Sequence, residues 1–255
     1  MTSPSFSLSG RKALVTGASR GIGAALAVGL AEAGADVAVA ARESPALAAT
    51  AAAIADAGRK SVAIAIDVRD PSAIRAGVER AVQALGGLDI LVNNAGVEEV
   101  RDSLAVDEAL WDRIVDTNLK GAFFCAQAAA RIMAASKGGA IVNLCSLTSE
   151  VGVPTAAPYG SSKSGLLGMT RALAAEWAAK GIRVNGIGPG YFRTDLTEVF
   201  YQNAEWRQAM LAKIPLRRFG RLDDLVGAAV FLCSDAAAYI TGQCLYIDGG
   251  YLASI

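Results

Sequence analysis

Tyr159 and Lys163 form the only Tyr-x-x-x-Lys pair in the chain of 255 residues, at the start of a predicted helix. This spacing places both side chains on one face of the helix. A free phenol titrates near 10, so acid–base work at neutral pH requires a pKa about 3 lower, or about 4 kcal/mol of preferential stabilisation of the phenolate. The neighbouring ammonium supplies positive charge for this purpose. The pair is therefore a candidate acid–base group for interconverting a ketone and an alcohol; the alternative is an exposed helix pair.

Histidine is absent from the chain. Its absence excludes a Ser-His-Asp triad, a Cys-His pair, a His general base and every His-containing zinc site. Proton transfer must then use Tyr, Lys, Cys, Asp or Glu. The sequence shows no cluster of metal ligands and hydride transfer needs no metal, so we predict no metal site. Ser146 lies 13 residues before Tyr159, where its hydroxyl could hold a substrate oxygen; the alternative is an ordinary loop serine.

The 24 Lys and Arg residues balance the 24 Asp and Glu residues, so the formal net charge is zero. This balance argues against nucleic acid or an anionic membrane as a partner. Hydrophobic residues make up 53% of the chain, but the best candidate for a membrane span, around residues 24–41, is interrupted by Glu32 and Asp36. The first ten residues do not resemble a signal peptide. The cysteines lie in apolar runs without CxxC pairing, which predicts reduced thiols and a cytoplasmic location.

Short apolar strands alternate with longer amphipathic or alanine-rich segments. Strands are predicted at Ala13–Thr16, Asp36–Ala41, Ser61–Ile66, Ile90–Val92, Ala140–Leu144, Arg183–Ile187 and Leu245–Ile247. Helices are predicted at Ile22–Ala33, Pro45–Ala57, Pro71–Leu85, Asp107–Ala135, Tyr159–Ala179 and Leu222–Cys233. This order predicts an α/β fold, a Rossmann-type doubly wound parallel sheet of about seven strands with helices on both faces. No repeat or linker divides the sequence, so residues 1–255 are expected to form a single domain.

A glycine-rich turn, Thr16-Gly17-Ala18-Ser19-Arg20-Gly21-Ile22-Gly23, joins the first predicted strand to the first predicted helix. Glycines there let the backbone approach a pyrophosphate, and the helix N-terminus supplies N–H groups and partial positive charge. The spacing differs from the common G-x-G-x-x-G pattern, and the alternative is an ordinary turn. The strand–turn–helix context favours dinucleotide binding at the carboxyl ends of the strands.

The sequence resembles the short-chain dehydrogenase/reductase family over nearly its whole length. The glycine turn is similar to the family's TGxxxGIG motif, residues 93–96 are similar to its NNAG segment, and Asn118, Ser146, Tyr159 and Lys163 match its four catalytic residues. The resemblance implies that Tyr159 is the general acid/base, that Lys163 adjusts its pKa and binds the nicotinamide ribose, and that Ser146 positions the carbonyl. It also implies that Asn118 sits at a local helix irregularity and holds a water linking Lys163 to solvent; the alternative is a satisfied buried amide.

The end of the second strand bears on the choice of cofactor. A site selective for NAD usually has a carboxylate there, but this chain has Ala41, followed by Arg42. Arg42 could bind a 2′-phosphate together with Ser19 and Arg20 of the glycine turn. We therefore predict NADP(H) rather than NAD(H). The alternative is that both arginines are solvated surface charges, with Glu43 neutralising Arg42.

Other predicted cofactor residues follow from the family resemblance. Asp67 and Val68 resemble the pair that contacts the adenine, although Asp67 could instead cap a helix, and Pro189-Gly190 with Thr194 resembles the segment around the nicotinamide. The full predicted set is Gly17, Ser19, Arg20, Ile22, Gly23, Arg42, Asp67, Val68, Asn94, Ala95, Gly96, Tyr159, Lys163, Pro189, Gly190 and Thr194. Family members are usually tetramers, so a homotetramer is expected, built on the two long helices and the C-terminal elements.

The predicted substrate is a small carbonyl or alcohol compound. Residues 190–216 are expected to form a substrate loop or lid; the alternative is a packed helical cap without substrate contact. Residues 143–150, 185–192 and 245–250 resemble gluconate 5-dehydrogenase members of the family, which implies a sugar acid, a polyol or a related small ketone. The aromatic residues of the loop are Tyr191, Phe192, Phe200, Tyr201 and Trp206, and the candidate polar contacts for substrate are Glu150, Tyr191, Arg193 and Arg101.

Two other functions remain open at this point. Lys137 and Lys180 resemble a basic pair that docks the acidic carrier protein in 3-oxoacyl-(acyl-carrier-protein) reductases, although helix ends collect lysine for electrostatic reasons as well. A non-catalytic regulator that binds NADP would also use the glycine turn. The loss of any of the four catalytic residues would favour the regulator, but all four are present.

Overall fold

A computed structural model describes residues 5–42, 45–194 and 198–255. Its centre is one sheet of seven parallel strands in the order β3-β2-β1-β4-β5-β6-β7. The strands are β1 Lys12–Thr16, β2 Asp36–Ala41, β3 Ser61–Ala65, β4 Ile90–Asn93, β5 Gly139–Leu144, β6 Ile182–Pro189 and β7 Cys244–Ile247. The strand order reverses at β1, which lies between β2 and β4. The crevice outside the carboxyl ends of β1 and β4 is therefore where a sheet of this kind binds ligands.

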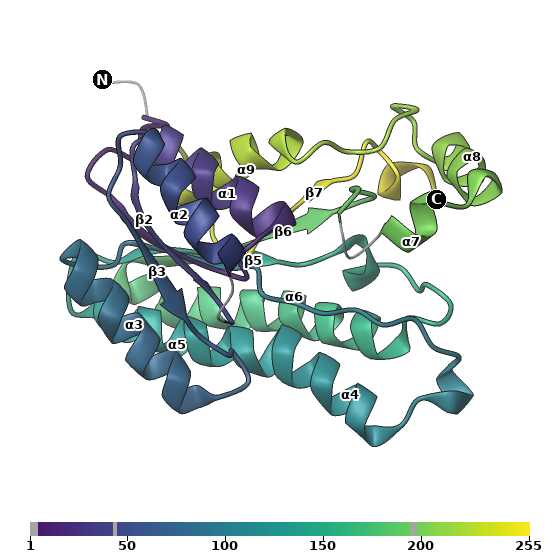
Figure 1. Ribbon diagram of the computed structural model, residues 1–255, viewed down its shortest axis with the longest axis horizontal. Coiled ribbons are helices and arrows are strands. Elements are labelled where there is room, and N and C mark those ends of the chain that lie inside the picture. The colour runs from purple at the N-terminus through teal and green to yellow at the C-terminus, as the bar shows by residue number, and fades with distance from the viewer. Residues whose placement is uncertain (1–4, 43–44, 195–197) are drawn as a thin grey trace.

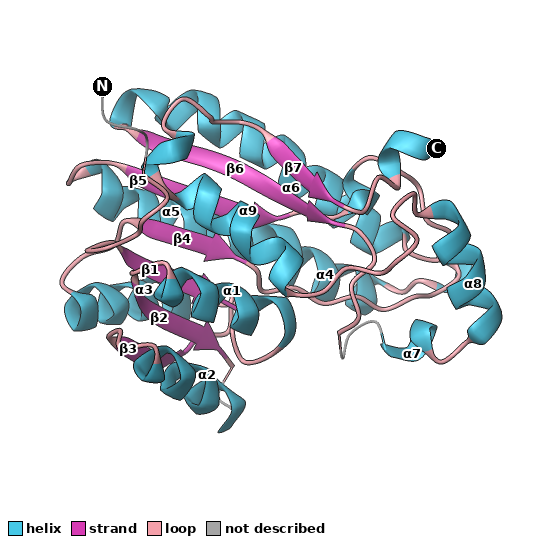
Figure 2. Ribbon diagram, turned by 90° about the horizontal axis from the view of Figure 1, so that it is seen from above, coloured by secondary structure: helices cyan, strands magenta, loops and turns pink. Residues whose placement is uncertain are grey.

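Helices cover both faces of the sheet (Figures 1 and 2). One face carries α1 Gly21–Glu32, α2 Pro45–Asp56 and α9 Asp223–Cys233, which share a core that includes Leu26, Val37 and Leu225. The other face carries α3 Pro71–Leu85, α5 Gly121–Ala134 and α6 Ala157–Trp177, which form a second core. The inner strands β1, β2, β4, β5 and β6 are buried from both sides, which explains their apolar runs, while the edge strands β3 and β7 are partly exposed. The predicted fold class is confirmed.

The predicted long helix at 107–135 is interrupted. It consists of α4 Glu108–Val115, a π-helical turn at Asp116–Lys120, and α5. The helical pattern of apolar residues continues through this turn, so sequence periodicity does not reveal it. A π turn re-aims the side chains that it carries and is frequent at functional sites. The irregularity that the resemblance implied at Asn118 is therefore present.

The segment expected to be a loop contains two helices, α7 Glu198–Tyr201 and α8 Ala204–Lys213. Figure 1 shows both beyond the carboxyl ends of β6 and β7, near the C-terminus. Helix α8 buries none of its side chains and has no apolar stripe that periodicity could detect. Among the described residues, no helix is both long and apolar enough to span a membrane.

Candidate active site

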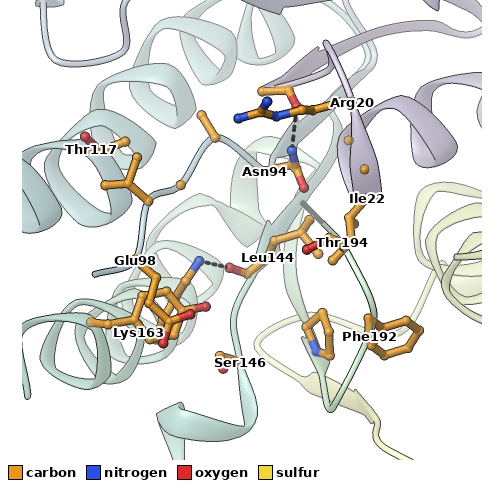
Figure 3. A pocket seen from close by; sticks show the side chains of 18 of the residues that line it. Arg20, Ile22, Asn94, Glu98, Thr117, Leu144, Ser146, Lys163, Phe192 and Thr194 are labelled. Atoms are coloured by element: carbon orange, nitrogen blue, oxygen red, sulfur yellow. Dashed lines mark hydrogen bonds between the residues drawn. The ribbon is translucent and has the colours of Figure 1, made fainter. Parts of the chain in front are cut away.

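A cavity of about 1090 Å³ opens at the carboxyl ends of the strands (Figure 3). Its wall contains every predicted cofactor residue, together with Ser146 and Tyr191. These residues come from segments spread over most of the chain, from Gly17 to Thr194. The fold thus brings the two predicted ends of the site, the glycine turn and the Tyr159–Lys163 pair, into one cavity.

The glycine turn is shaped by its contacts with the end of β4. The Asn94 amide donates to the carbonyl oxygens of Thr16 and Gly17, both at 3.0 Å. Gly17 has a φ of +65°, and a Cβ on it would lie 2.7 Å from the Ala95 Cα. A Cβ on Gly23 would lie 2.3 Å from both the Asn94 amide nitrogen and the Gly17 oxygen. Both positions therefore require glycine, and the first turn of α1 faces the cavity with no side-chain cap on its N–H groups.

The predicted adenosine end contains three guanidinium groups. Arg20 and Arg42 line the cavity as expected, and Arg42 is exposed. Sequence reasoning missed Arg69, which also lines the cavity and donates to the Asp67 carboxylate at 2.6 Å. This hydrogen bond is the main reason that the pKa of Asp67 lies below its usual value. No carboxylate stands at the end of β2, where Ala41 is half-buried, and Glu43 lies outside the described residues.

Tyr159 and Lys163 lie in the first turns of α6, and Lys163 is 5% exposed. The Lys163 ammonium donates to the Leu144 carbonyl oxygen at 2.6 Å and lies 5.6 Å from the centroid of the Tyr159 ring. Burial lowers the pKa of Lys163 to about 8. Burial also raises the pKa of Tyr159 above its usual value, and a hydrogen bond with the Ser146 hydroxyl opposes this rise. The structure thus differs from the sequence argument, because burial, rather than the nearby ammonium, sets the pKa of the phenol.

Ser146 follows β5 and begins a single 3-10 turn at Leu147–Ser149. Its hydroxyl oxygen accepts a hydrogen bond from the Thr148 N–H at 3.2 Å, which fixes its orientation. The neighbouring Ser149 hydroxyl donates to the Lys163 carbonyl oxygen at 2.9 Å and so ties this turn to α6. Ser149 is therefore a structural link, while Ser146 faces the cavity next to Tyr159.

Asn118 lies in the π turn, 1% exposed, behind the cavity wall. Its amide oxygen accepts from the Val97 N–H at 2.8 Å, and its amide nitrogen donates to the Val97 carbonyl at 2.9 Å and to the Ser162 hydroxyl at 3.1 Å. The side chain thus fits the alternative of a satisfied buried amide. It links the irregular segment that follows β4 to α6 through Val97 and Ser162.

Glu98 is a site residue that sequence reasoning missed. It lies two residues after the Asn-Asn-Ala-Gly segment and lines the cavity, and Figure 3 shows it next to Lys163. Burial raises its pKa, and the nearby Lys163 opposes the rise. The charge of Glu98 in turn raises the pKa of Tyr159. The only signal in the sequence that pointed to Glu98 was its position shortly after the Asn-Asn-Ala-Gly segment.

The predicted substrate contacts divide into two groups. Tyr191 lines the cavity, packed edge-on against Trp206 and Tyr251. Arg193 and Glu150 do not line it. Arg193 is 64% exposed and pairs with Glu198 at 2.6 Å, and Glu150 accepts from the Tyr246 hydroxyl at 2.9 Å.

The remaining predicted substrate and carrier contacts lie away from the cavity. Arg101, the further candidate cation, pairs with Glu99 and Asp107 outside the cavity wall. Lys137 and Lys180 immediately precede β5 and β6, at the amino ends of the strands and opposite the cavity. The side chain of Phe200 lies outside the described residues.

The chain is similar to known dehydrogenases and reductases over nearly its whole length. A family profile described as Enoyl-(Acyl carrier protein) reductase matches residues 17–252. The chain is 40% identical to gluconate 5-dehydrogenase of Gluconobacter oxydans over 98% of each protein. It is 42% identical to 3-oxoacyl-(acyl-carrier-protein) reductase of Staphylococcus aureus, over 94% of this chain and 97% of that protein. A crystal structure of gluconate 5-dehydrogenase from Burkholderia cenocepacia with NADP and tartrate matches with a TM-score of 0.95 at 39% identity, over 98% of each chain.

Proposed function

The chain belongs to the short-chain dehydrogenase/reductase family, and we propose that it is an NADP(H)-dependent oxidoreductase that interconverts a secondary alcohol and a ketone. The observation that carries this proposal is the shared cavity. Ser146, Tyr159 and Lys163 line the same cavity as the glycine turn that precedes α1. A binding protein without catalysis has no need for a buried phenol, ammonium and hydroxyl at that place.

The residues present fit a dinucleotide. The turn at Gly17 and Gly23 admits no side chain, which allows close backbone approach, and the uncapped N–H groups of α1 suit a pyrophosphate. Arg20 and Arg42 both line this end of the cavity and would bind the 2′-phosphate. Lys163 would hold the nicotinamide ribose. When bound, the nicotinamide supplies or takes up the hydride, and its oxidised form carries a positive charge.

Tyr159 performs the proton transfer in this proposal. In the reductive direction its hydroxyl gives a proton to the substrate oxygen, and its raised pKa keeps the phenol protonated beforehand. Ser146 holds the same oxygen by a hydrogen bond. In the oxidative direction the phenolate must form, and positive charge close to Tyr159 lowers the cost of forming it in a buried site. The Lys163 ammonium, 5.6 Å from the Tyr159 ring, supplies part of that charge.

The substrate in this proposal is a small polyhydroxylated compound, either a sugar acid or a polyol, or the corresponding ketone. Two of the matched relatives are gluconate 5-dehydrogenases. Tyr191 and Trp206 line the side of the cavity beyond Ser146 and would cover such a substrate. The proposed site therefore has polar groups at its base and aromatic rings at its lid, an arrangement suited to the two faces of a sugar ring or chain.

A second candidate is reduction of a 3-oxoacyl thioester, favoured by the 42% identity to the Staphylococcus aureus reductase. The lysines that could dock an acidic carrier, Lys137 and Lys180, lie at the amino ends of β5 and β6. A carrier bound to them would face away from the cavity of the same chain. The small polyhydroxylated substrate therefore remains the main proposal.

The proposal is tested by following NADPH oxidation at 340 nm with 5-keto-D-gluconate, L-sorbose, an acetoacetyl thioester and simple diketones. Turnover of a hydroxylated ketone, faster with NADPH than with NADH, is expected. Turnover of the thioester alone would replace the substrate proposal with the second candidate. Tight NADPH binding without turnover of any compound would indicate a non-catalytic regulator.

We also propose that the chain assembles as a homotetramer. Helix α5 presents partly buried Phe123 and Phe124, and a Cβ on Gly168 in α6 would meet nothing within 4 Å. Such a face suits close packing of helices between subunits. Light scattering coupled to size-exclusion chromatography tests this, and a monomer mass would refute it.

A further inference from the structure

Two acidic side chains, Asp67 and Glu98, line the described cavity wall, and they differ in their hydrogen-bond partners. Asp67 is paired with Arg69 at the adenosine end. Glu98 receives no hydrogen bond from any described residue. Its neighbour Glu99 points to the rim, where it accepts from Arg101 and Arg113. The Glu98 carboxylate thus remains available to a ligand beside Tyr159.

Two buried hydroxyls also lack partners in this cavity. Thr148 is 9% exposed and Tyr201 is 4% exposed, and neither hydroxyl oxygen finds a hydrogen-bond partner among the described residues. Both residues line the cavity wall. A buried hydroxyl without a partner is unfavourable, so a pair of them in one cavity favours a ligand with polar groups at this place. Hydroxyl groups of a substrate can donate to or accept from both.

Two cations of the cavity wall lie near this end, and each already has a partner. Arg113 pairs with Glu99, and the Lys163 ammonium donates to the Leu144 carbonyl and would use its other donors for the nicotinamide ribose. Arg20 lies in the turn before α1, Arg42 follows β2, and Arg69 lies between β3 and α3, all at the cofactor end. A substrate carboxylate would therefore meet the like charge of the half-buried Glu98, where solvent screens the repulsion less than at the surface. A substrate hydroxyl would instead donate to that carboxylate.

Resting on the proposed function, we infer that Glu98 selects the substrate by charge, so that the cavity takes an uncharged sugar alcohol or its ketose rather than a sugar acid. Glu98 accepts hydrogen bonds from substrate hydroxyls, and Thr148 and Tyr201 bind further hydroxyls. Oxidation then transfers the carbinol hydrogen with its electron pair to NADP⁺ and the hydroxyl proton to the phenolate of Tyr159, and gives the ketose, NADPH and the neutral phenol.

The test uses two pairs of compounds. In each pair, one member is neutral and the other has a carboxylate at one end, and the two are otherwise alike. D-Sorbitol and D-gluconate share their configuration from C2 to C6, and L-sorbose and 5-keto-D-gluconate are the corresponding ketones. The ratio of kcat/KM for the neutral compound to that for the acid is measured in the wild type, in Glu98→Gln and in Glu79→Gln. Glu79 is an exposed residue of α3 outside the cavity wall, so its variant removes the same charge elsewhere.

We expect a wild-type ratio above one that falls about tenfold in Glu98→Gln, the effect of about 1.4 kcal/mol of charge repulsion. The ratio should stay unchanged in Glu79→Gln. A wild type that prefers the acids, or a ratio that Glu98→Gln leaves unchanged, overturns the inference.

Binding measurements separate this inference from the proposed function. If none of the four compounds is turned over, the proposed substrate class fails. The dissociation constant of D-gluconate is then measured from the fluorescence of bound NADPH. Tighter gluconate binding in Glu98→Gln than in the wild type supports charge selection at Glu98 even in that case, and equal binding refutes it.

Discussion

Replacing Lys163 with Met removes a buried ammonium and keeps a side chain of similar length, so the variant measures what burial of that charge costs. Lys163 is 5% exposed, and burial lowers its pKa from 10.5 to about 8. At 1.36 kcal/mol for each pKa unit, this difference corresponds to about 3 kcal/mol. Folding therefore disfavours the charged side chain by about this amount before a cofactor binds.

The effect on stability depends on pH in a defined direction. Below pH 8 the lysine is protonated in both the folded and the unfolded chain, so the full cost is present. Between pH 8 and 10.5 the unfolded chain binds more protons than the folded chain, so the free energy of unfolding rises with pH. Lys163→Met lacks this group. The wild type should therefore gain about 2 kcal/mol relative to the variant between pH 7 and pH 10.

Urea unfolding without cofactor, followed by circular dichroism at pH 7, 8, 9 and 10, measures this gain. The free energy of unfolding of the variant is subtracted from that of the wild type at each pH, which removes the contribution of the other tyrosines and cysteines. Lys60→Met is the matched control, because Lys60 is exposed, and its difference from the wild type should stay flat with pH. A flat difference for Lys163→Met as well, or one that falls as the pH rises, would refute the assignment of a destabilised ammonium to Lys163.

Three further predictions concern the cofactor and the chemistry. Gly23→Ala places a methyl group 2.3 Å from the Asn94 amide, so NADPH affinity measured by fluorescence titration should fall at least a hundredfold, while Gly227→Ala, whose Cβ meets nothing within 4 Å, should keep it. Arg42→Ala should lower the ratio of kcat/KM for NADPH to that for NADH by about tenfold or more, as expected for the loss of a charged contact to phosphate. An unchanged ratio would remove Arg42 from cofactor selection. Tyr159→Phe should reduce kcat by about 10² to 10⁴ with NADPH binding retained, and a fully active variant would exclude the proposed proton transfer.

The fold was predictable because its strands carry strong local signals. Residues 37–41 are a continuous apolar run, and β2 spans Asp36–Ala41 as predicted. Asp70 followed by Pro71 caps α3 as expected. The π turn at Asp116–Lys120 was invisible to periodicity, because one extra residue in a turn leaves the surrounding apolar pattern helical. Only the family resemblance pointed to it. Helix α8 lacked a signal for a different reason, since it buries no side chain and so carries no apolar stripe.

The candidate catalytic and cofactor residues were predictable because the carboxyl ends of parallel strands lie at the same edge of the sheet. The turn after β1, Asn94 after β4, Ser146 after β5 and Pro189 at the end of β6 all arrive there by topology alone. The sequence does not reveal which charged side chains form ion pairs in the folded chain. Arg193 and Arg101 looked available for a substrate carboxylate, but the fold pairs them with Glu198 and Glu99.

The charge of the substrate end therefore depends on pairings that composition does not reveal. Glu98 and Glu99 are adjacent and chemically identical, yet Glu99 binds two arginines at the rim and Glu98 faces Tyr159 in the cavity. The two unpartnered hydroxyls come from the turn after β5 and from α7, segments about fifty residues apart in the sequence. Only the folded chain places Glu98, Thr148 and Tyr201 around one cavity. The inferred preference for an uncharged substrate therefore rests on Glu98 and these two hydroxyls, and not on the catalytic residues.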